Sequence, residues 1–403
     1  MSVQLYKSPA FYIRKRLFSN KLAVFGLTII LIAHLIAVLG YLIMPDGTPN
    51  VTEGSVEISK KTPFFKTKIL KTKKNIEVDK VNLFRRLYNG QESEYMLYPI
   101  SSYKIDGDKV FFNVGRDPRE ISYTLLDAVK AISLEGSVEK LSKTSEDTVT
   151  YLDMAGDIRY TTLHDLKRDF EANNIEERTF YLGTDPSGRD MLSLLLYGTR
   201  ISLFIGFISV IISLVVGISL GAMAGYFGGI IDDIVMWIMT VFWSIPSIML
   251  VVAISMALQS KGLWVVFIAI GLTMWVEIAL LVRGEVKSIK GKLYIDAART
   301  LGVSNFNIIY KHILPNILGS LIVITTSNFA SAILTEAGLS FLGLGVQSPT
   351  PSWGIMIKEG FKIMMTPDSW HIILLPSLCI SLLVLAFNLL GNGLRDAYDP
   401  KNS

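Results

Sequence analysis

The chain has 403 residues, of which 50% are hydrophobic, with a mean hydropathy of +0.43 and a formal net charge of +4. Residues 46–190 hold 22 Lys/Arg and 25 Asp/Glu, whereas the other 258 residues hold only 17 and 10. The charge-poor part contains uninterrupted apolar stretches of membrane-spanning length, which exclude a uniform soluble globule and a disordered chain. The composition therefore predicts a polytopic membrane protein with one polar insert.

Six apolar segments of roughly 20 residues each predict six transmembrane helices. They are residues 22–44, 201–226, 234–258, 263–282, 316–335 and 371–394. The first segment is longer than a signal-peptide core and no small-x-small cleavage site precedes Pro45, so we expect it to remain as an anchor. The single cysteine, Cys379, excludes an internal disulfide and a thiolate metal cluster.

The distribution of Lys and Arg predicts the orientation, because short cytoplasmic flanks are enriched in these residues. The two termini and the loop 283–315 together have thirteen, whereas the short flanks on the opposite side have four. We expect both termini and this loop in the cytoplasm and the insert outside the membrane. Because the net charge lies mostly in short loops, it reflects topology and does not indicate nucleic-acid binding. The predicted domains are residues 1–45, the insert 46–190, and a five-helix core 191–403.

The insert has sequence features of a folded α+β domain. Asp106-Gly107 separates two alternating segments and predicts a tight hairpin, and a second hairpin is expected at Ala155-Gly156. Thr162 can then cap a helix whose apolar residues share one face and which ends at Asn173-Asn174. At 145 residues the insert can bury a core of its own.

Small residues recur every four positions along the second span. They are Ser209, Ser213, Gly217, Gly221 and Gly225. Small side chains allow a neighbouring helix to approach closely, so we favour helix packing over a substrate role for this stripe. In the third span, Pro246 removes a backbone hydrogen bond and predicts a kink, which either lines a pathway or is a packing feature.

Two ionisable residues lie at membrane depth, where charge is costly. For His34 we favour a neutral, hydrogen-bonded helix contact, and for Glu277 a partner on another helix or another subunit. A proton-coupled secondary transporter would need paired charges near the midplane and matching broken helices, which this sequence lacks.

The loop 283–315 contains the most informative segment. Four residues at i, i+3, i+4 and i+7 predict a short helix with a narrow apolar face. They are Tyr294, Ala297, Ala298 and Leu301. Gly302 follows as a left-handed stop, Ser304 can cap a second helix, and Pro315 precedes the next span. The alanines suit insertion into a groove of another protein; the alternative is an amphipathic loop on the lipid surface.

This segment resembles a signature of ABC importer permeases: Glu-Ala-Ala, three residues, Gly, nine residues, Ile-x-Leu-Pro. Asp296 stands for the Glu and His312 for the Ile, while Ala297, Ala298, Gly302 and the Leu314-Pro315 pair keep their spacing. Further motifs resemble the oligopeptide/dipeptide/nickel permease family. They are Leu-Gly-Thr-Asp and Gly-Arg-Asp within 182–190, Leu-Ser-Phe-Leu-Gly-Leu-Gly at 339–345, Pro-Ser-Trp-Gly at 351–354 and Phe-Asn-Leu-Leu-Gly-Asn-Gly-Leu-Arg-Asp at 387–396. The resemblance covers the first span and about 181–400.

The resemblance implies a type I importer permease in a cell inner membrane that pairs with a homologous permease. The segment 296–302 would be the coupling helix that docks on two ATP-binding subunits, which bind ATP and Mg, and an extracytoplasmic binding protein would deliver substrate. The chain lacks a G-x-x-x-x-G-K-[ST] loop, so we expect a transport subunit that is not an enzyme and binds no cofactor.

Peptides are the expected substrates, with nickel or another small solute as the alternative. A secondary transporter and a membrane-anchored receptor are less favoured, and the chain has no metal-ligand cluster at the usual spacing. The family's corresponding outer segment is shorter, so the resemblance implies no role for the insert. We expect it either to dock the binding protein or partner permease, or only to add stability.

Overall fold

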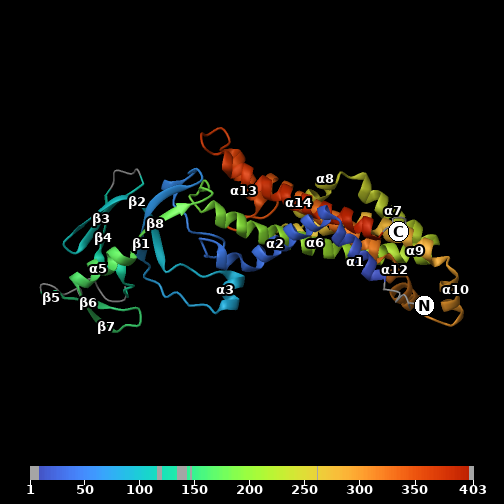
Figure 1. Ribbon diagram of the computed structural model, residues 1–403, viewed down its shortest axis with the longest axis horizontal. Coiled ribbons are helices and arrows are strands. Elements are labelled where there is room, and N and C mark those ends of the chain that lie inside the picture. The colour runs from blue at the N-terminus through green and yellow to red at the C-terminus, as the bar shows by residue number, and fades with distance from the viewer. Residues whose placement is uncertain (1–8, 116–119, 134–142, 146–147, 261, 399–403) are drawn as a thin grey trace, which may run out of the picture. The chain divides into compact units, whose positions relative to one another are not determined.

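The computed structural model describes residues 9–115, 120–133, 143–145, 148–260 and 262–398 (Figure 1). The chain forms two compact units. The helical unit comprises residues 1–37, 198–358 and 376–403, and the insert unit comprises residues 38–197 and 359–375. Three basic residues used to predict the orientation, Lys7, Lys261 and Lys401, lie outside the described residues.

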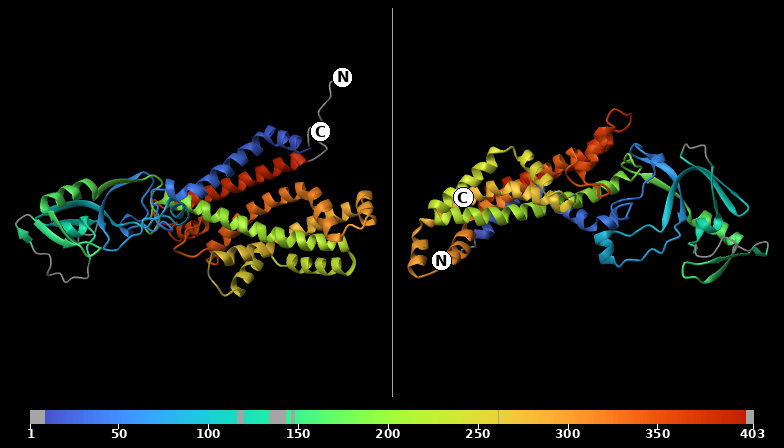
Figure 2. Two further views of the ribbon diagram at one scale, coloured as in Figure 1. Left: turned by 90° about the horizontal axis from the view of Figure 1, so that it is seen from below. Right: turned by 180° about the vertical axis from the view of Figure 1, so that it is seen from behind.

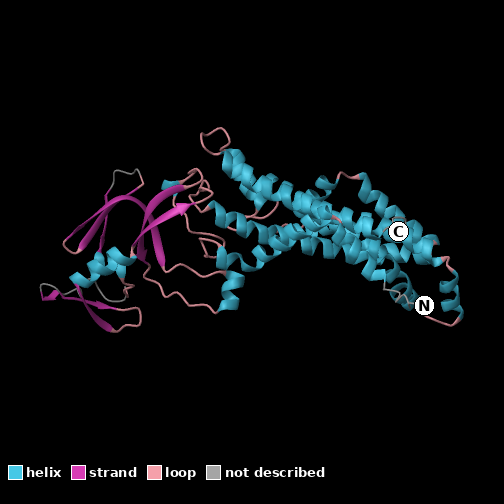
Figure 3. Cartoon of the chain, viewed as in Figure 1, coloured by secondary structure: helices cyan, strands magenta, loops and turns pink. Residues whose placement is uncertain are grey.

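The membrane-type part of the chain consists of helices (Figure 3). They are α1 (Pro9–Ser19), α2 (Lys21–Ile43), α6 (Met191–Phe227), α7 (Gly229–Ser244), α8 (Ser247–Ala257), α9 (Leu263–Lys290), α10 (Leu293–Thr300), α11 (Asn305–Asn307), the π-helix η3 (Ile308–Ile313), α12 (Leu314–Leu342), α13 (Trp353–Lys362) and α14 (Trp370–Tyr398). Within the described residues, five helices are long and apolar enough to cross a membrane, or six spans when α7 and α8 count as one. Helix α9 lies against α12 and α8, as the views in Figure 2 also show.

The third predicted span is not one kinked helix, which corrects the prediction for 234–258. Helices α7 and α8 are bent by 98° at a break, and Pro246 lies in that break. The residue before a proline is forced towards extended backbone, and Ile245 accordingly has φ −98° and ψ 129°. The predicted kink at Pro246 is therefore a complete interruption of the helix.

The insert contains an antiparallel five-stranded sheet in the order β4-β3-β2-β1-β8. Its strands are β1 (Phe65–Lys73), β2 (Tyr95–Asp106), β3 (Lys109–Val114), β4 (Glu120–Thr124) and β8 (Ile175–Phe180). Helices α4 (Leu125–Val129) and α5 (Leu163–Asn173) pack on this sheet, and Leu70, Phe112, Leu125 and Phe170 form a fully buried core with their neighbours. The predicted α+β fold and the hairpin at Asp106-Gly107 are both confirmed.

A second sheet has the order β5-β6-β7, formed by β5 (Lys143–Ser145), β6 (Thr148–Leu152) and β7 (Ile158–Thr162). The hairpin between β6 and β7 turns at Ala155-Gly156, as predicted. Thr162 then caps α5 by accepting a hydrogen bond from the Asp165 amide, and Asn174 ends the helix. The sequence therefore predicted this strand-to-helix junction correctly.

The Gly-Thr-Asp and Gly-Arg-Asp motifs before α6 form a tight loop in the insert unit. Asp185 accepts a hydrogen bond from the Arg189 amide and forms an ion pair with its guanidinium at 2.6 Å. A Cβ on Gly183 or Gly188 would overlap the backbone of Lys61 or Ser55, and both glycines have positive φ. The motif thus holds the segment that enters the insert directly against the start of α6.

Candidate functional site

The glycines of the α6 stripe lie against α9. A Cβ on Gly221 would be 2.5 Å from the Ala279 carbonyl oxygen, and one on Gly225 would be 2.8 Å from the Arg283 oxygen. Gly217 approaches Ile278 and the Trp275 carbonyl equally closely. The two helices are therefore in backbone contact, and no larger residue fits between them without a shift.

The serines of the same stripe are fully buried further along α6. The Ser213 hydroxyl donates to the Val210 carbonyl of its own helix, and the Ser209 carbonyl oxygen would be 2.9 Å from a Cβ on Gly271 of α9. Within the described residues the Ser209 hydroxyl has no hydrogen-bond partner. The structure thus places all five predicted stripe residues on the side of α6 that faces neighbouring helices.

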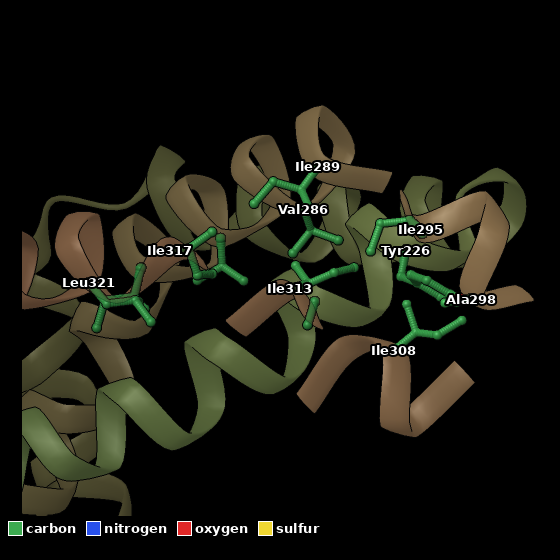
Figure 4. Close-up of a cluster of buried hydrophobic side chains, with 12 residues drawn as sticks. Tyr226, Val286, Ile289, Ile295, Ala298, Ile308, Ile313, Ile317 and Leu321 are labelled. Atoms are coloured by element: carbon green, nitrogen blue, oxygen red, sulfur yellow. The ribbon is translucent and has the colours of Figure 1, made fainter. Parts of the chain in front are cut away.

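A buried cluster fixes the loop 283–315 onto the ends of α6, α9 and α12 (Figure 4). It consists of Ala222, Tyr226, Ile278, Val282, Val286, Ile289, Ile295, Ala298, Ile308, Ile313, Ile317 and Leu321. Of the α10 residues, only Ile295 and Ala298 are buried. Apart from the Tyr226 ring, the side chains are branched aliphatic or small, and close packing among them holds the loop on the helices beneath it.

The predicted apolar face of α10 lies mostly on the surface of the chain. Tyr294 and Leu301 are 44% and 83% exposed, and Ala297 is exposed as well, so only Ala298 of the four predicted residues is buried. The cluster selects Ile295 instead, because this β-branched residue lies one helical turn before Ala298 and both reach the same apolar neighbours. Most of the predicted apolar face is therefore exposed, and Ile295, which the prediction did not include, is buried with Ala298.

The turn after α10 has the predicted conformation. Gly302 has φ +77°, and its amide donates to the Arg299 carbonyl. The Ser304 hydroxyl accepts from the Asn307 amide and begins α11. The next span begins earlier than predicted: Leu314 is its first residue and Pro315 lies in its first turn, where a missing amide proton costs nothing.

The loop also begins later than predicted, because α9 continues for two turns to Lys290. Arg283 and Lys287 are consequently helical, and both bind Asp232 of α7, with nitrogen–oxygen distances of 2.8 and 2.6 Å. Asp232 is buried and Arg283 is largely so. Two of the six basic residues that were assigned to the loop, Arg283 and Lys287, therefore join α9 to α7.

Tyr226 at the end of α6 connects α10 and α11, and the sequence analysis did not identify it. Its hydroxyl donates to Asn305 Oδ1 at 2.8 Å, and the Arg299 guanidinium lies over its ring at 5.3 Å. Lys290 stacks on the same ring. The ring itself is buried in the cluster. Tyr226 thus sets the position of α10 relative to the membrane helices.

The outer surface of this loop is strongly apolar. Its large exposed side chains are Leu293 (87%), Tyr294, Leu301 (83%), Phe306 (74%) and Tyr310. The rings of Phe306 and Tyr310 stack on each other, while Asp296 and Arg299 form an exposed ion pair at 3.1 Å. We call these five apolar side chains the α10 surface. Exposed apolar residues gathered this densely on one loop are typical of a protein interaction site.

The two ionisable residues flagged at membrane depth have different surroundings. The Nδ1 atom of His34 lies within hydrogen-bond distance, 2.8 Å, of the Ile30 carbonyl oxygen in its own helix. Glu277 is exposed on α9. Thr273, Gly284 and Ser288 lie along the same open side of that helix at spacings of one or two turns, and none of them is buried.

A third ionisable residue at membrane depth was missed. Glu336 is fully buried, and its oxygens accept hydrogen bonds from the hydroxyls of Ser340 at 2.8 Å and Ser202 at 3.4 Å. It thereby links α12 to α6. The predicted span ended at Thr335, directly before Glu336, whereas α12 continues to Leu342, and the motif noted in the sequence begins only at position 339.

Comparison with known proteins identifies the type of chain. Residues 217–403 match the family described as binding-protein-dependent transport system inner membrane component, and residues 8–52 match the N-terminal TM domain of oligopeptide transport permease C. These two matches leave residues 53–216 unmatched.

Relatives of known name agree with this assignment. The dipeptide transport system permease protein DppC of Bacillus subtilis is 43% identical over 221 residues, which cover 55% of this chain and 68% of the relative. The glutathione transport system permease protein GsiD of Pectobacterium atrosepticum is 40% identical over 246 residues, covering 60% and 81%. A chain of the MetNI methionine ABC transporter in inward-facing conformations is 22% identical, with a TM-score of 0.41, covering 52% of this chain and 98% of its own. The chain belongs to the family of inner membrane components of binding-protein-dependent transport systems.

Proposed function

We propose that this chain is the permease subunit of an ATP-driven peptide importer. It forms half of the translocation pathway together with a homologous permease, and it receives substrate from an extracytoplasmic binding protein. Two ATP-binding subunits dock on the α10 surface and bind the ATP and Mg, so the chain itself performs no catalysis. Dipeptides, oligopeptides and glutathione are named for its relatives, which supports peptides over nickel.

The α10 surface is the observation that carries this proposal. Gly302 and Tyr226 fix α10 rigidly on the membrane helices, while its exposed face presents Leu293 and Leu301. A force applied by an ATPase to this surface is transmitted to α6, α9 and α12 through a close-packed cluster. The exposed Ala297 beside Leu301 keeps the helix narrow enough to enter a groove.

We infer an orientation as part of this proposal. The α10 surface and both termini are cytoplasmic, and the insert is extracytoplasmic, in agreement with thirteen against four basic residues in the short flanks. A cysteine at position 130 in a Cys379→Ser background should react with an impermeant thiol reagent outside intact cells, whereas one at position 300 should not. The opposite labelling pattern would overturn this orientation.

The open side of α9 borders the partner permease or the pathway. Glu277 is exposed on that side among small and polar residues, and an exposed carboxylate at this depth is costly in lipid. This placement favours a partner on another subunit over one within the chain.

Co-purification tests the proposed docking. The wild-type chain should retain its ATP-binding subunits, and Leu301→Glu should lose them because a charge enters an apolar contact. Met365→Glu is the matched control, since Met365 is 91% exposed but lies in the insert unit. Retention of the ATPases by Leu301→Glu would contradict docking through α10.

A further inference from the structure

An unusually long connection joins two neighbouring strands of the insert. Strands β1 and β2 are antiparallel, and their ends pair directly at Lys73 and Tyr95. A hairpin connection needs about two to five residues, yet residues 74–94 lie between these ends. A connection of this length in a compact domain points to a function of its own.

The connection is ordered by its own hydrogen bonds. Lys73 and Glu94 form an ion pair across its base. The Gln91 side chain accepts from the Val81 amide at 3.1 Å and donates to the Asp79 carbonyl at 3.0 Å. Asn82 caps the helix α3 (Leu83–Asn89) by accepting from the Arg85 amide. These bonds order the connection 74–94, and α3 therefore has a defined position within it.

That position is set by the end of a membrane-spanning helix. Gly90, directly after α3, lies so close to Tyr41 and Gly47 that a Cβ would be 2.7 Å from the Tyr41 ring and 2.6 Å from the Gly47 oxygen. The Gln91 amide also donates to the Gly47 oxygen at 2.9 Å. Tyr41 belongs to the last turn of α2, a candidate span, and Figure 1 shows α3 beside this end of α2. Helix α3 consequently lies beside the end of a candidate membrane span.

The composition of α3 suits a lipid surface. Leu83, Phe84 and Tyr88 are 60%, 81% and 72% exposed, and Arg85 and Arg86 are exposed beside them. Each of its seven residues, all of them described, is exposed or half-buried. The outer end of α2 is also apolar and exposed, with Val38 at 61% and Ile43 at 56%. Aromatic and arginine side chains at this depth match the headgroup region of a bilayer.

We propose that α3 is an interfacial anchor that holds the insert on the membrane surface. Leu83, Phe84 and Tyr88 enter the boundary between headgroups and acyl chains, and Arg85 and Arg86 bind phospholipid phosphates. The position of α3 beside the last turn of a candidate span selects lipid as the occupant, because the exposed apolar side chains at the end of such a span face the bilayer. This inference depends only on α2 spanning the membrane and not on the transported substrate.

Spin labelling of the full chain in its assembled transporter tests the anchor. In a Cys379→Ser background, a label at Phe84→Cys is compared with one at Tyr160→Cys, which is 68% exposed on β7. The transporter is reconstituted in vesicles of phosphatidylethanolamine and phosphatidylglycerol. The ratio of collision rates with oxygen and with a water-soluble nickel chelate is expected to be severalfold higher at position 84, because oxygen concentrates in lipid.

Two further measurements separate lipid from other occupants. Replacing Arg85 and Arg86 together by Gln should lower the ratio at position 84 in vesicles with phosphatidylglycerol and leave it unchanged at position 160. Equal ratios at 84 and 160 in vesicles would overturn the proposal. Protection of position 84 that appears only after the binding protein is added would also overturn it and would assign α3 to protein docking.

Discussion

The α10 surface and the insert are built on different principles. The loop 283–315 lies within the family match and is held by a cluster of apolar side chains. The helices α6 and α9 beneath it are in close contact at the glycines of α6. The insert lies almost wholly outside both family matches and folds around a sheet with its own apolar core. In the helical unit, therefore, added atoms at small residues should be the most damaging change, whereas the insert should behave like a soluble domain that can be altered by itself.

The largest effect is expected for Gly221→Val. Its Cβ would be 2.5 Å from the Ala279 carbonyl oxygen, so α6 and α9 must separate, at a cost of about 3 kcal/mol or more. We expect loss of assembled transporter, measured by size-exclusion chromatography in detergent. Gly338→Val in α12 is the control, because a Cβ there meets nothing within 4 Å. Equal losses from both variants would show that helix propensity, and not close packing, limits assembly.

Gly302→Val should abolish coupling while leaving the chain inserted. A β-branched residue at φ +77° costs about 1–2 kcal/mol and redirects the end of α10. Uptake in cells lacking the wild-type copy is expected to fall by tenfold or more. Gly291→Val is the matched control, since Gly291 in the same loop has φ −84° and open space at its Cβ position. Normal uptake by Gly302→Val would refute the proposed role of this turn.

The insert unit should respond to pH at Asp46, just after α2. Burial raises the pKa of Asp46 from 3.8 to about 6, against the opposing hydrogen bond from Thr48. The folded state therefore binds the proton more tightly, and this contribution to stability is present below about pH 4 and lost as the pH rises to about 6. The loss amounts to about 3 kcal/mol.

Thermal unfolding of the wild type and Asp46→Asn between pH 4 and 7 measures this contribution. The stability of the wild type relative to the variant should decline across this interval, because the side-chain amide of the variant does not titrate. Parallel curves for the two proteins would exclude Asp46 as the titrating group.

Tyr226→Phe should have a smaller effect on coupling. It removes the hydrogen bond to Asn305, worth about 1 kcal/mol, but keeps the ring that packs in the cluster and lies under Arg299. ATPase stimulation by the loaded binding protein should fall severalfold with unchanged complex assembly. Asn305→Ala combined with Tyr226→Phe should be no worse than either alone; additive losses would show that the two residues act separately.

Local sequence patterns predicted those parts of the site that depend on backbone conformation. Gly302, the Ser304 cap and the close-packed glycines of α6 follow from rules that operate within a few residues. The buried face of α10 did not, because Ile295 is selected by Ile308 and Ile313 from a later segment. The role of Tyr226 could not be predicted for the same reason, because its hydrogen-bond partner Asn305 is 79 residues away in the sequence.

The fold shows the same division between local and distant determinants. Both hairpins and the Thr162 cap were predicted because their signals are adjacent in sequence. The pairing of β1 with β8, which brings Phe65 opposite Phe180, joins segments more than 100 residues apart and has no local signal. The long connection 74–94 that contains α3 could not be predicted either, because its length is unusual only once the ends of β1 and β2 are known to pair.

The β1–β8 pairing allows the insert to be removed without disturbing the loop before α6. Thr67 and Arg178 are registered neighbours, so a two-residue Asn-Gly turn can replace residues 68–177 and close a short hairpin. The segment held by Gly183 and Gly188 remains in place, and the α10 surface is untouched. We expect normal assembly and basal ATPase activity, since neither depends on the deleted core. If the insert docks the binding protein, stimulation by the loaded protein should fall about twofold to threefold. Unchanged stimulation and uptake would instead leave stability as the role of the insert, and loss of basal coupling would show that the two regions are not separable.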